Sequence, residues 1–188
     1  ALNSSLYTYE VAPVFTIMEL EIYEKMLNFV GFNGGEGIFV PGGSIGNLYG
    51  INVARYCKFP EIKTKGVFAL KKPLCLFTSE KCHYSIEKAA FTLGLGTEAV
   101  FSVKTDARGK MLPEDLENKV LLSIEQGYQP FYVNCTCGTT VFGAFDPIEP
   151  IADICKKYDL WLHVDGAYGG SVCLSRKYRH LLKGTERA

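Results

Sequence analysis

Apolar residues along the chain follow two kinds of spacing. In residues 14–32 they recur every three or four positions, which predicts an amphipathic helix. The same spacing predicts helices at residues 45–56, 84–93, 113–126 and 148–158. Short runs in which almost every residue is apolar instead predict buried strands. These runs are residues 37–40, 74–78, 100–104, 130–135 and 160–164.

The order of these elements predicts the fold class. Strands and helices alternate, and the strands are apolar throughout rather than on one side only. This combination is typical of an α/β fold with a mainly parallel sheet and helices on both faces. No repeat or linker divides the chain, so we expect a single domain. In such sheets, ligands bind outside the carboxyl ends of the strands.

The composition narrows the class of protein further. The chain has 188 residues, 47% of them hydrophobic, and its 20 Lys+Arg balance its 20 Asp+Glu. This neutral balance favours neither a nucleic acid nor a membrane as partner. No apolar run approaches the roughly 20 residues that span a bilayer, and ALNSSLYTYE does not resemble a signal peptide. We therefore expect a cytoplasmic protein.

Seven cysteines are scattered along the chain, several within apolar runs. An odd number of scattered cysteines favours reduced, buried thiols. Cys135 and Cys137 could form half of a zinc site, but no second pair has zinc-finger spacing. We therefore expect no metal.

Polar segments follow four of the predicted strands at their carboxyl ends. They are PGGSIGN, TSEKCHYS, NCTCGTT and the segment that begins at Asp165. Because the carboxyl ends of parallel strands meet at one edge of a sheet, we expect one pocket built from all four segments.

PGGSIGN and His83 each have two interpretations. Glycines followed by Ser44 and a helix can bind a phosphate through free backbone N–H groups. Alternatively, Gly42 and Gly43 form a turn and Ser44 is the N-cap of the helix. His83, at the start of a helix, is either a satisfied surface histidine or an aromatic acid–base group over a ligand.

Asp165 ends a predicted buried strand, where a carboxylate is costly unless it meets a cation or several donors. The small residues that follow leave room for a bulky ligand: Gly166, Ala167, Gly169 and Gly170. One hypothesis is an iron site in which His163 and Asp165 share a strand face. Its third ligand would be His83 or His180. The other is a cationic ligand atom, and pyridoxal 5'-phosphate combines a phosphate, a flat ring and a protonated ring nitrogen.

The chain resembles the group II pyridoxal-phosphate decarboxylases, in their acidic amino-acid branch. The matching stretches cover essentially all 188 residues in order and spacing. They include YTYEVAPVF, GIFVPGGSIGNLYG, LFTSEKCHYSIEKAA, CGTTVFGAFDPIEPIADIC and LWLHVDGAYGG. The resemblance implies the large domain of a fold-type I pyridoxal-phosphate-dependent transferase-like protein, a homodimer, and pyridoxal 5'-phosphate as cofactor.

The resemblance also implies roles for individual residues. His83 would stack on the pyridine ring and handle protons, and Asp165 would form a salt bridge to the ring nitrogen, so both are expected to be catalytic. The other implied cofactor contacts are Gly43, Ser44, Thr140 and Ala167. The family usually has alanine at the position of Gly166, so we expect Asp165 to be held less rigidly here.

The segment before TYE borders the substrate side chain in the family. Ser5 and Tyr7 are closer to the cysteine sulfinate and aspartate decarboxylase pattern than to the Asn-Met-Phe of glutamate decarboxylases. The expected reaction is therefore α-decarboxylation of cysteine sulfinate to hypotaurine or of aspartate to β-alanine. The PFYVN stretch is glutamate-decarboxylase-like, so glutamate stays an alternative, as does simple packing of Ser5 and Tyr7. A catalytically silent homologue is a further alternative.

The family's lysine that bonds to the cofactor aldehyde lies in an Asn-Pro-His-Lys motif. By the resemblance, this motif would follow residue 188. We therefore expect residues 1–188 to be part of the cofactor-binding large domain, truncated before the lysine-bearing strand and poorly stable alone.

Overall fold

The computed structural model describes residues 5–188. It contains two units, Ala1–Phe39 and Val40–Ala188, and each is described by itself. In the first unit, α1 (Pro13–Val30) begins with a proline at its first turn and ends at Gly31. Gly31 has a φ of 91° and donates its N–H to the carbonyl of Leu27, a common helix stop.

Residues 37–40 do not form a strand, so that prediction is wrong. The N–H of Phe39 donates to the hydroxyl of Tyr23 at 2.9 Å. The Tyr23 ring also lies so close to Gly37 that a Cβ there would be 3.0 Å from it. In the first unit, the Tyr23 side chain therefore contacts the backbone of residues 37–39. A strand would instead need a neighbouring strand to pair with its backbone N–H and C=O groups.

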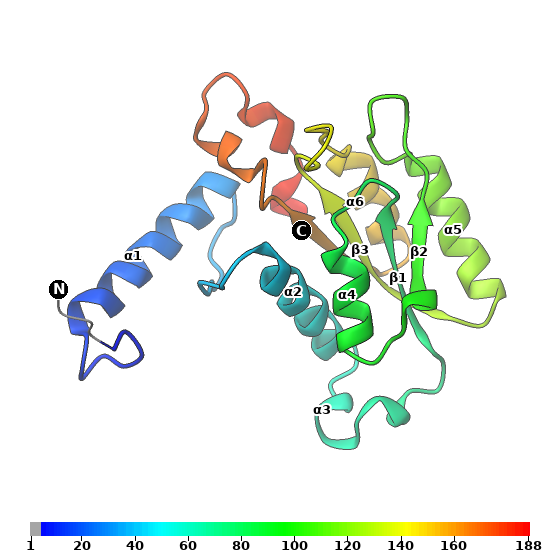
Figure 1. The fold of residues 1–188 in the computed structure, drawn as a ribbon, viewed down its shortest axis with the longest axis horizontal. Helices are drawn as coiled ribbons and strands as arrows, with labels where there is room; N and C mark the ends of the chain where they lie inside the picture. Colours follow the sequence, from blue (N-terminus) through cyan, green and yellow to red (C-terminus); the bar gives the residue numbers. More distant parts are fainter. Residues whose placement is uncertain (1–4) are drawn as a thin grey trace. The chain divides into compact units, whose positions relative to one another are not determined.

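The second unit contains a four-stranded sheet in the order β2-β1-β3-β4 (Figure 1). All neighbouring strands are parallel. The strands are β1 (Leu74–Ser79), β2 (Val100–Val103), β3 (Gln129–Thr136) and β4 (Trp161–Asp165). The predicted parallel sheet is confirmed, with strand boundaries within one residue of those expected.

Helices cover both faces of this sheet, as predicted. One face carries α2 (Gly43–Lys58) and α4 (Ser85–Thr92), and the other carries α5 (Pro113–Glu125) and α6 (Ile148–Lys157). The remaining helices are the short α3 (Ile62–Lys65) and the 3₁₀ turns Val67–Ala69, Thr97–Ala99, Gly170–Leu174, Arg179–Leu182 and Thr185–Arg187.

Each face of the sheet has its own apolar core. Under α5 and α6, buried residues include Phe77, Leu116 and Val133. Under α2 and α4, they include Ile51 and Leu76. Burial of both faces explains why the strands are apolar throughout rather than alternating.

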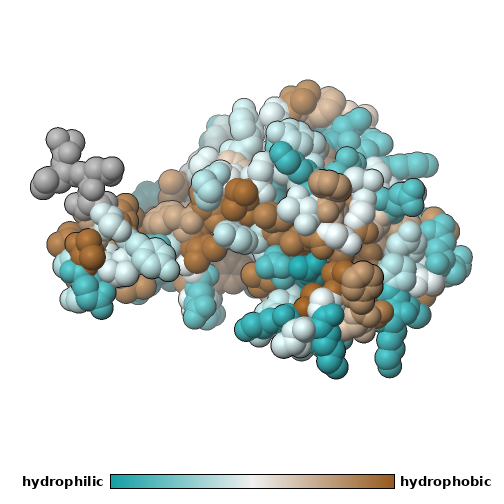
Figure 2. All heavy atoms as spheres, turned by 60° about the horizontal axis from the view of Figure 1, so that its bottom comes forward, coloured by the Kyte–Doolittle hydropathy of each residue, from teal (hydrophilic) through white to brown (hydrophobic). Residues whose placement is uncertain are grey.

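The cysteines are free thiols, as the sequence predicts. Five of them are buried: Cys75, Cys135, Cys137, Cys155 and Cys173. At the surface, apolar side chains are interspersed with polar ones (Figure 2). Within residues 5–188, no helix combines the length and the apolar character needed to cross a membrane.

Candidate functional site

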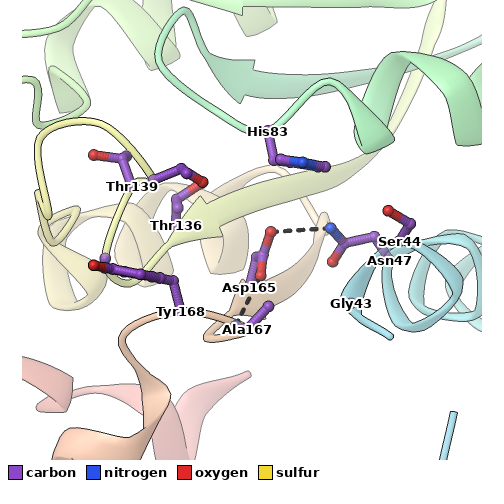
Figure 3. Close-up of a pocket in the computed structure, with 11 residues that line it drawn as sticks. Gly43, Ser44, Asn47, His83, Thr136, Thr139, Asp165, Ala167 and Tyr168 are labelled. Atoms are coloured by element: carbon purple, nitrogen blue, oxygen red, sulfur yellow. Dashed lines mark hydrogen bonds between the residues drawn. The ribbon is translucent and has the colours of Figure 1, made fainter. Parts of the chain in front are cut away.

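A cavity of about 250 Å³ lies in the second unit at the carboxyl edge of the sheet (Figure 3). All four predicted segments line it: the start of α2, the turn after β1, the loop after β3, and the end of β4 with the residues that follow. The lining residues are Gly43, Ser44, Asn47, His83, Thr136, Gly138, Thr139, Thr140, Asp165, Ala167 and Tyr168. The expected convergence of the four segments is confirmed.

The start of α2 presents backbone amides and a hydroxyl to this cavity. The N-cap is Gly42, with a φ of 96°, and no side chain caps the helix, so the interpretation of Ser44 as N-cap is wrong. The first amides of a helix have no acceptor within it, and its dipole attracts negative charge. Gly43 must be small, because a Cβ there would lie 2.7 Å from that of Ala167. This end of the cavity suits an anionic group.

Asp165 is the last residue of β4 and is buried. Its Oδ1 accepts the N–H of Ala167 at 3.0 Å, and its Oδ2 accepts the Asn47 side-chain amide at 2.9 Å (Figure 3). The ion pairs found among residues 5–188 do not include Asp165. A buried carboxylate with two neutral donors can therefore still accept a cation from the cavity.

His83 lies across the cavity from Ala167, with Asp165 between them in the view of Figure 3. Its Nδ1 lies 2.9 Å from the Ser85 hydroxyl and accepts the Ser85 N–H at 3.2 Å. Because Nδ1 accepts, the neutral ring carries its hydrogen on Nε2. The side chains of His83 and Ala167 thus form the two walls of a slot that suits a flat ring.

Asn47 is the main polar group that the sequence analysis missed. It is 4% exposed, and its amide nitrogen donates to Asp165 and, at 2.9 Å, to the Ser85 hydroxyl. Its Oδ1 lies 3.0 Å from Nε2 of His163. The spacing gave one signal, since Ser44 and Asn47 are three residues apart and so share a helix face. Thr136, Gly138, Thr139 and Tyr168 were also missed.

His163 points toward Asn47, on the same side of β4 as Asp165. Its ring stacks on that of Tyr132, with ring centroids 5.6 Å apart. Burial lowers the pKa of His163 to about 4, with a smaller opposing effect from Asp165. The ring is therefore neutral at pH 7. Because the Asn47 amide nitrogen donates to Asp165, Oδ1 of Asn47 faces Nε2 of His163, which carries the ring hydrogen.

The iron and zinc hypotheses find no ligand set in residues 5–188. Groups of three or more His, Cys, Asp or Glu side chains suited to a metal are absent from this part of the chain. His163 is bonded to Asn47, and Nδ1 of His180 bonds to the carbonyl of Lys177. Within residues 5–188, the buried pair Cys135 and Cys137 is not part of a group of three or more such side chains that could hold a metal.

The small residues after Asp165 have different roles from one another. Ala167 lines the cavity, as expected. Gly169 does not leave room for a ligand, because a Cβ there would lie 2.4 Å from the carbonyl oxygen of Cys137. Its size instead allows the loops after β3 and β4 to touch. At Gly166 an added Cβ would fit only tightly, because it would lie 3.1 Å from the Cα of Gly170.

Ser5 and Tyr7 belong to the first unit and are exposed in it, Tyr7 to 93%. The cavity is lined by residues of the second unit. The expected contact of Ser5 and Tyr7 with substrate therefore stays a prediction.

The profile of the pyridoxal-dependent decarboxylase conserved domain matches residues 1–188. The chain belongs to this family. It is 57% identical to the cysteine sulfinic acid decarboxylase of Rattus norvegicus, over 100% of this chain and 38% of that protein. It is 55% identical to the acidic amino acid decarboxylase of Xenopus tropicalis, over 100% of this chain and 37% of that protein. The chain thus spans less than two fifths of the length of these relatives.

The fold is also similar to those of two solved structures. The crystal structure of apo mouse CSAD superposes with a TM-score of 0.97 at 56% identity, over 99% of this chain and 39% of that one. The Oryza sativa TDC structure with PLP and tryptamine superposes with a TM-score of 0.87 at 27% identity, over 99% and 42%.

Proposed function

We propose that the protein is a decarboxylase that uses pyridoxal 5'-phosphate to remove the α-carboxylate of a small acidic amino acid, with cysteine sulfinate as the preferred substrate. The observation that carries this proposal is Asp165, a buried carboxylate that faces a cavity and forms no ion pair within residues 5–188. The high identity to cysteine sulfinic acid decarboxylase favours that substrate.

The cavity fits the cofactor part by part. The amides at the start of α2, with Gly43 and Ser44, suit the phosphate. The slot between His83 and Ala167 suits the pyridine ring, and Asp165 would hold a proton at the ring nitrogen. Thr140, also in the lining, would lie beside the ring.

When bound, the cofactor supplies a pyridinium ring that accepts the electron pair left at the substrate's α-carbon as carbon dioxide departs. The chain's own residues keep this ring in its effective state. Asp165 stabilises the protonated nitrogen by charge, and its two hydrogen bonds hold the carboxylate in place. His83, with its hydrogen on Nε2, would cover the ring and donate a proton at the α-carbon.

We further propose that Ser5 and Tyr7 select among acidic substrates. A tyrosine hydroxyl and a small serine suit a shorter acidic side chain than that of glutamate. In the full-length protein, Tyr7→Phe should change the ratio of kcat/KM for cysteine sulfinate over glutamate. An unchanged ratio would mean that the residue only packs.

Turnover by the full-length protein tests the proposed function. Carbon dioxide release from cysteine sulfinate, aspartate and glutamate would be measured side by side, with and without added pyridoxal 5'-phosphate. We expect cofactor-dependent turnover, fastest with cysteine sulfinate or aspartate. A preference for glutamate would reassign the substrate, and release from none of the three by cofactor-loaded protein would identify a silent homologue. We also propose a cytoplasmic homodimer, which sedimentation and localisation of the full-length protein would check.

A further inference from the structure

Four polar side chains from separate parts of the second unit form one connected network in and behind the wall of the cavity. They are Asn47 on α2, Ser85 at the start of α4, and His163 and Asp165 on β4. Ser85 passes the connection on to His83. Asn47 is the centre, since it contacts residues 38, 116 and 118 positions away in the chain.

The orientation of the Asn47 amide is determined by its neighbours. Asp165 Oδ2 lies 2.9 Å from the amide nitrogen, and a carboxylate oxygen accepts only from a donor. A flipped amide would bring two oxygens together at this distance. With the amide oriented in this way, Oδ1 of Asn47 faces Nε2 of His163 at 3.0 Å, so the ring hydrogen of His163 lies on Nε2 and is donated to Oδ1.

The direction of each further hydrogen bond follows from this orientation. The second Asn47 amide hydrogen goes to the Ser85 hydroxyl oxygen at 2.9 Å. Because that oxygen accepts from Asn47, the Ser85 hydroxyl hydrogen is free to point at His83 Nδ1, 2.9 Å away. The Ser85 N–H supports the same assignment at 3.2 Å. The hydrogen of the neutral His83 ring therefore lies on Nε2.

Close packing keeps the centre of the network in place. Asn47 and Ser85 are 4% and 2% exposed, so bulk water does not compete for their hydrogen bonds. A Cβ at Gly50, one turn along α2, would lie 2.6 Å from the His163 ring. The glycine thus allows the helix to approach the histidine that orients Asn47.

We propose that Asn47 is a positioning residue that links the two functional groups of the cavity. Through one amide it fixes the Asp165 carboxylate, and through Ser85 it fixes the hydrogen of His83 on Nε2. This inference rests on the proposed function for its effect on turnover, but the network itself can be tested without turnover.

The two branches can be separated by substitution in the full-length protein. Asn47→Ala removes the bond to Asp165 and the donor that directs the Ser85 hydroxyl hydrogen to His83, whereas Ser85→Ala leaves the Asn47–Asp165 bond and removes only the hydroxyl link to His83. Ser85→Thr keeps a hydroxyl and should restore the link. Asn52→Ala is the matched control, because Asn52 lies on the same helix but bonds to Arg55.

The first measurement is the ¹⁵N chemical shifts of the His83 ring, with and without pyridoxal 5'-phosphate. We expect the Nε2–H form in the parent protein, in Ser85→Thr and in Asn52→Ala, and a shift toward mixed forms in Ser85→Ala and Asn47→Ala. The second is turnover, where Asn47→Ala should lower kcat by about 10- to 100-fold, the effect of losing a hydrogen bond to a charged group, with KM little changed.

Ser85→Ala should lower kcat by a smaller factor than Asn47→Ala, and Ser85→Thr should recover most of that loss. Unchanged His83 shifts in both Asn47→Ala and Ser85→Ala would overturn the proposal, as would a kcat for Asn47→Ala equal to that of Asn52→Ala. A parent protein that bound no cofactor and released no carbon dioxide would instead refute the proposed function. Even then, the ¹⁵N shifts of the parent and its variants would decide whether Asn47 and Ser85 fix the His83 ring hydrogen on Nε2.

Discussion

The two faces of the sheet bury different chemistry near the carboxyl ends of the strands. Toward α5 and α6, β3 contributes Val133 and Cys135 to an apolar core. Toward α2 and α4, the next residues of the same strand are Asn134 and Thr136, and Thr136 is paired in register with Asp165. Successive side chains of a strand point to opposite faces, so one backbone supports both environments.

The difference teaches where stability and chemistry are located in this fold. On the polar face, the Asn134 amide donates to the Thr78 hydroxyl at 3.0 Å. The buried side-chain atoms without a partner among the described residues are the Tyr132 hydroxyl and Asn134 Oδ1. Unpaired buried polar atoms are costly, so we infer that near the carboxyl ends of the strands the apolar face supplies stability that the polar face lacks.

The largest expected effect is on turnover, from the polar face. Asp165→Ala in the full-length protein should lower kcat by about 1000-fold or more, because the cofactor nitrogen loses the charge that keeps it protonated. Steady-state kinetics on cysteine sulfinate would measure this, with cofactor content checked by absorbance. Substantial activity in a cofactor-loaded variant would refute the role of Asp165.

A matched change on the apolar face should affect stability instead. Leu116 is fully buried under α5. Leu116→Ala should lower the free energy of unfolding by about 2 to 5 kcal/mol through the cavity it leaves, with kcat per folded molecule unchanged. Denaturant unfolding and kinetics on the same sample would test this. A loss of kcat comparable with that of Asp165→Ala would remove the distinction between the faces.

The buried His163 on the polar face should make the free energy of unfolding depend on pH. The pKa of His163 is lowered to about 4, so between pH 6.5 and 4 the unfolded chain binds a proton that the folded protein does not. Stability should therefore fall as the pH falls through this window, by up to about 3 kcal/mol from this group. In His163→Gln, unfolding measured across the window should show a flatter pH dependence than the parent protein.

Asp146 provides the contrast in the same window. Burial raises its pKa to about 6, against the opposing effect of backbone N–H groups from Met111 and Thr136. Here the folded protein keeps a proton that the unfolded chain loses, so this contribution to stability grows as the pH falls from 6 toward 4. Asp146→Asn should thus steepen the acid loss that His163→Gln flattens. Equal slopes in the two variants would contradict both assignments.

The smallest effect is expected at Gly166, beside Asp165. An added methyl group would meet the backbone of Gly170 at 3.1 Å, while the loss of unfolded-chain freedom favours alanine. Gly166→Ala should therefore change the free energy of unfolding by less than about 1 kcal/mol. If Asp165 is held less rigidly because of Gly166, kcat should rise modestly in this variant. A thermal melt and steady-state kinetics would check both parts.

The sequence predicted most of the sheet because burial on two faces leaves a strong local pattern. All four strands of the second unit were expected, and so were the α-helices between them. The run at residues 37–40 has the same apolar pattern but no neighbouring strand among residues 5–188. Strand formation depends on a partner distant in sequence, and local pattern does not contain that information.

Half of the candidate site could be predicted in the same way. His83 follows β1 and Asp165 ends β4, so their convergence in one cavity is a consequence of parallel topology, whereas Ser44 lies at the start of α2 after a run that forms no strand. Asn47 could not be predicted, because its role depends on a contact 118 residues away. Gly169 was misread for a similar reason, since its neighbour is the backbone of Cys137 and not a ligand.

The central claim is that Asp165 holds a proton on the ring nitrogen of the bound cofactor. The most direct measurement is the ¹⁵N chemical shift of ring-labelled pyridoxal 5'-phosphate bound to the full-length protein, in the parent and in Asp165→Ala. The account predicts a protonated nitrogen in the parent at neutral pH and an unprotonated one in the variant. An unprotonated nitrogen in the parent protein would contradict it.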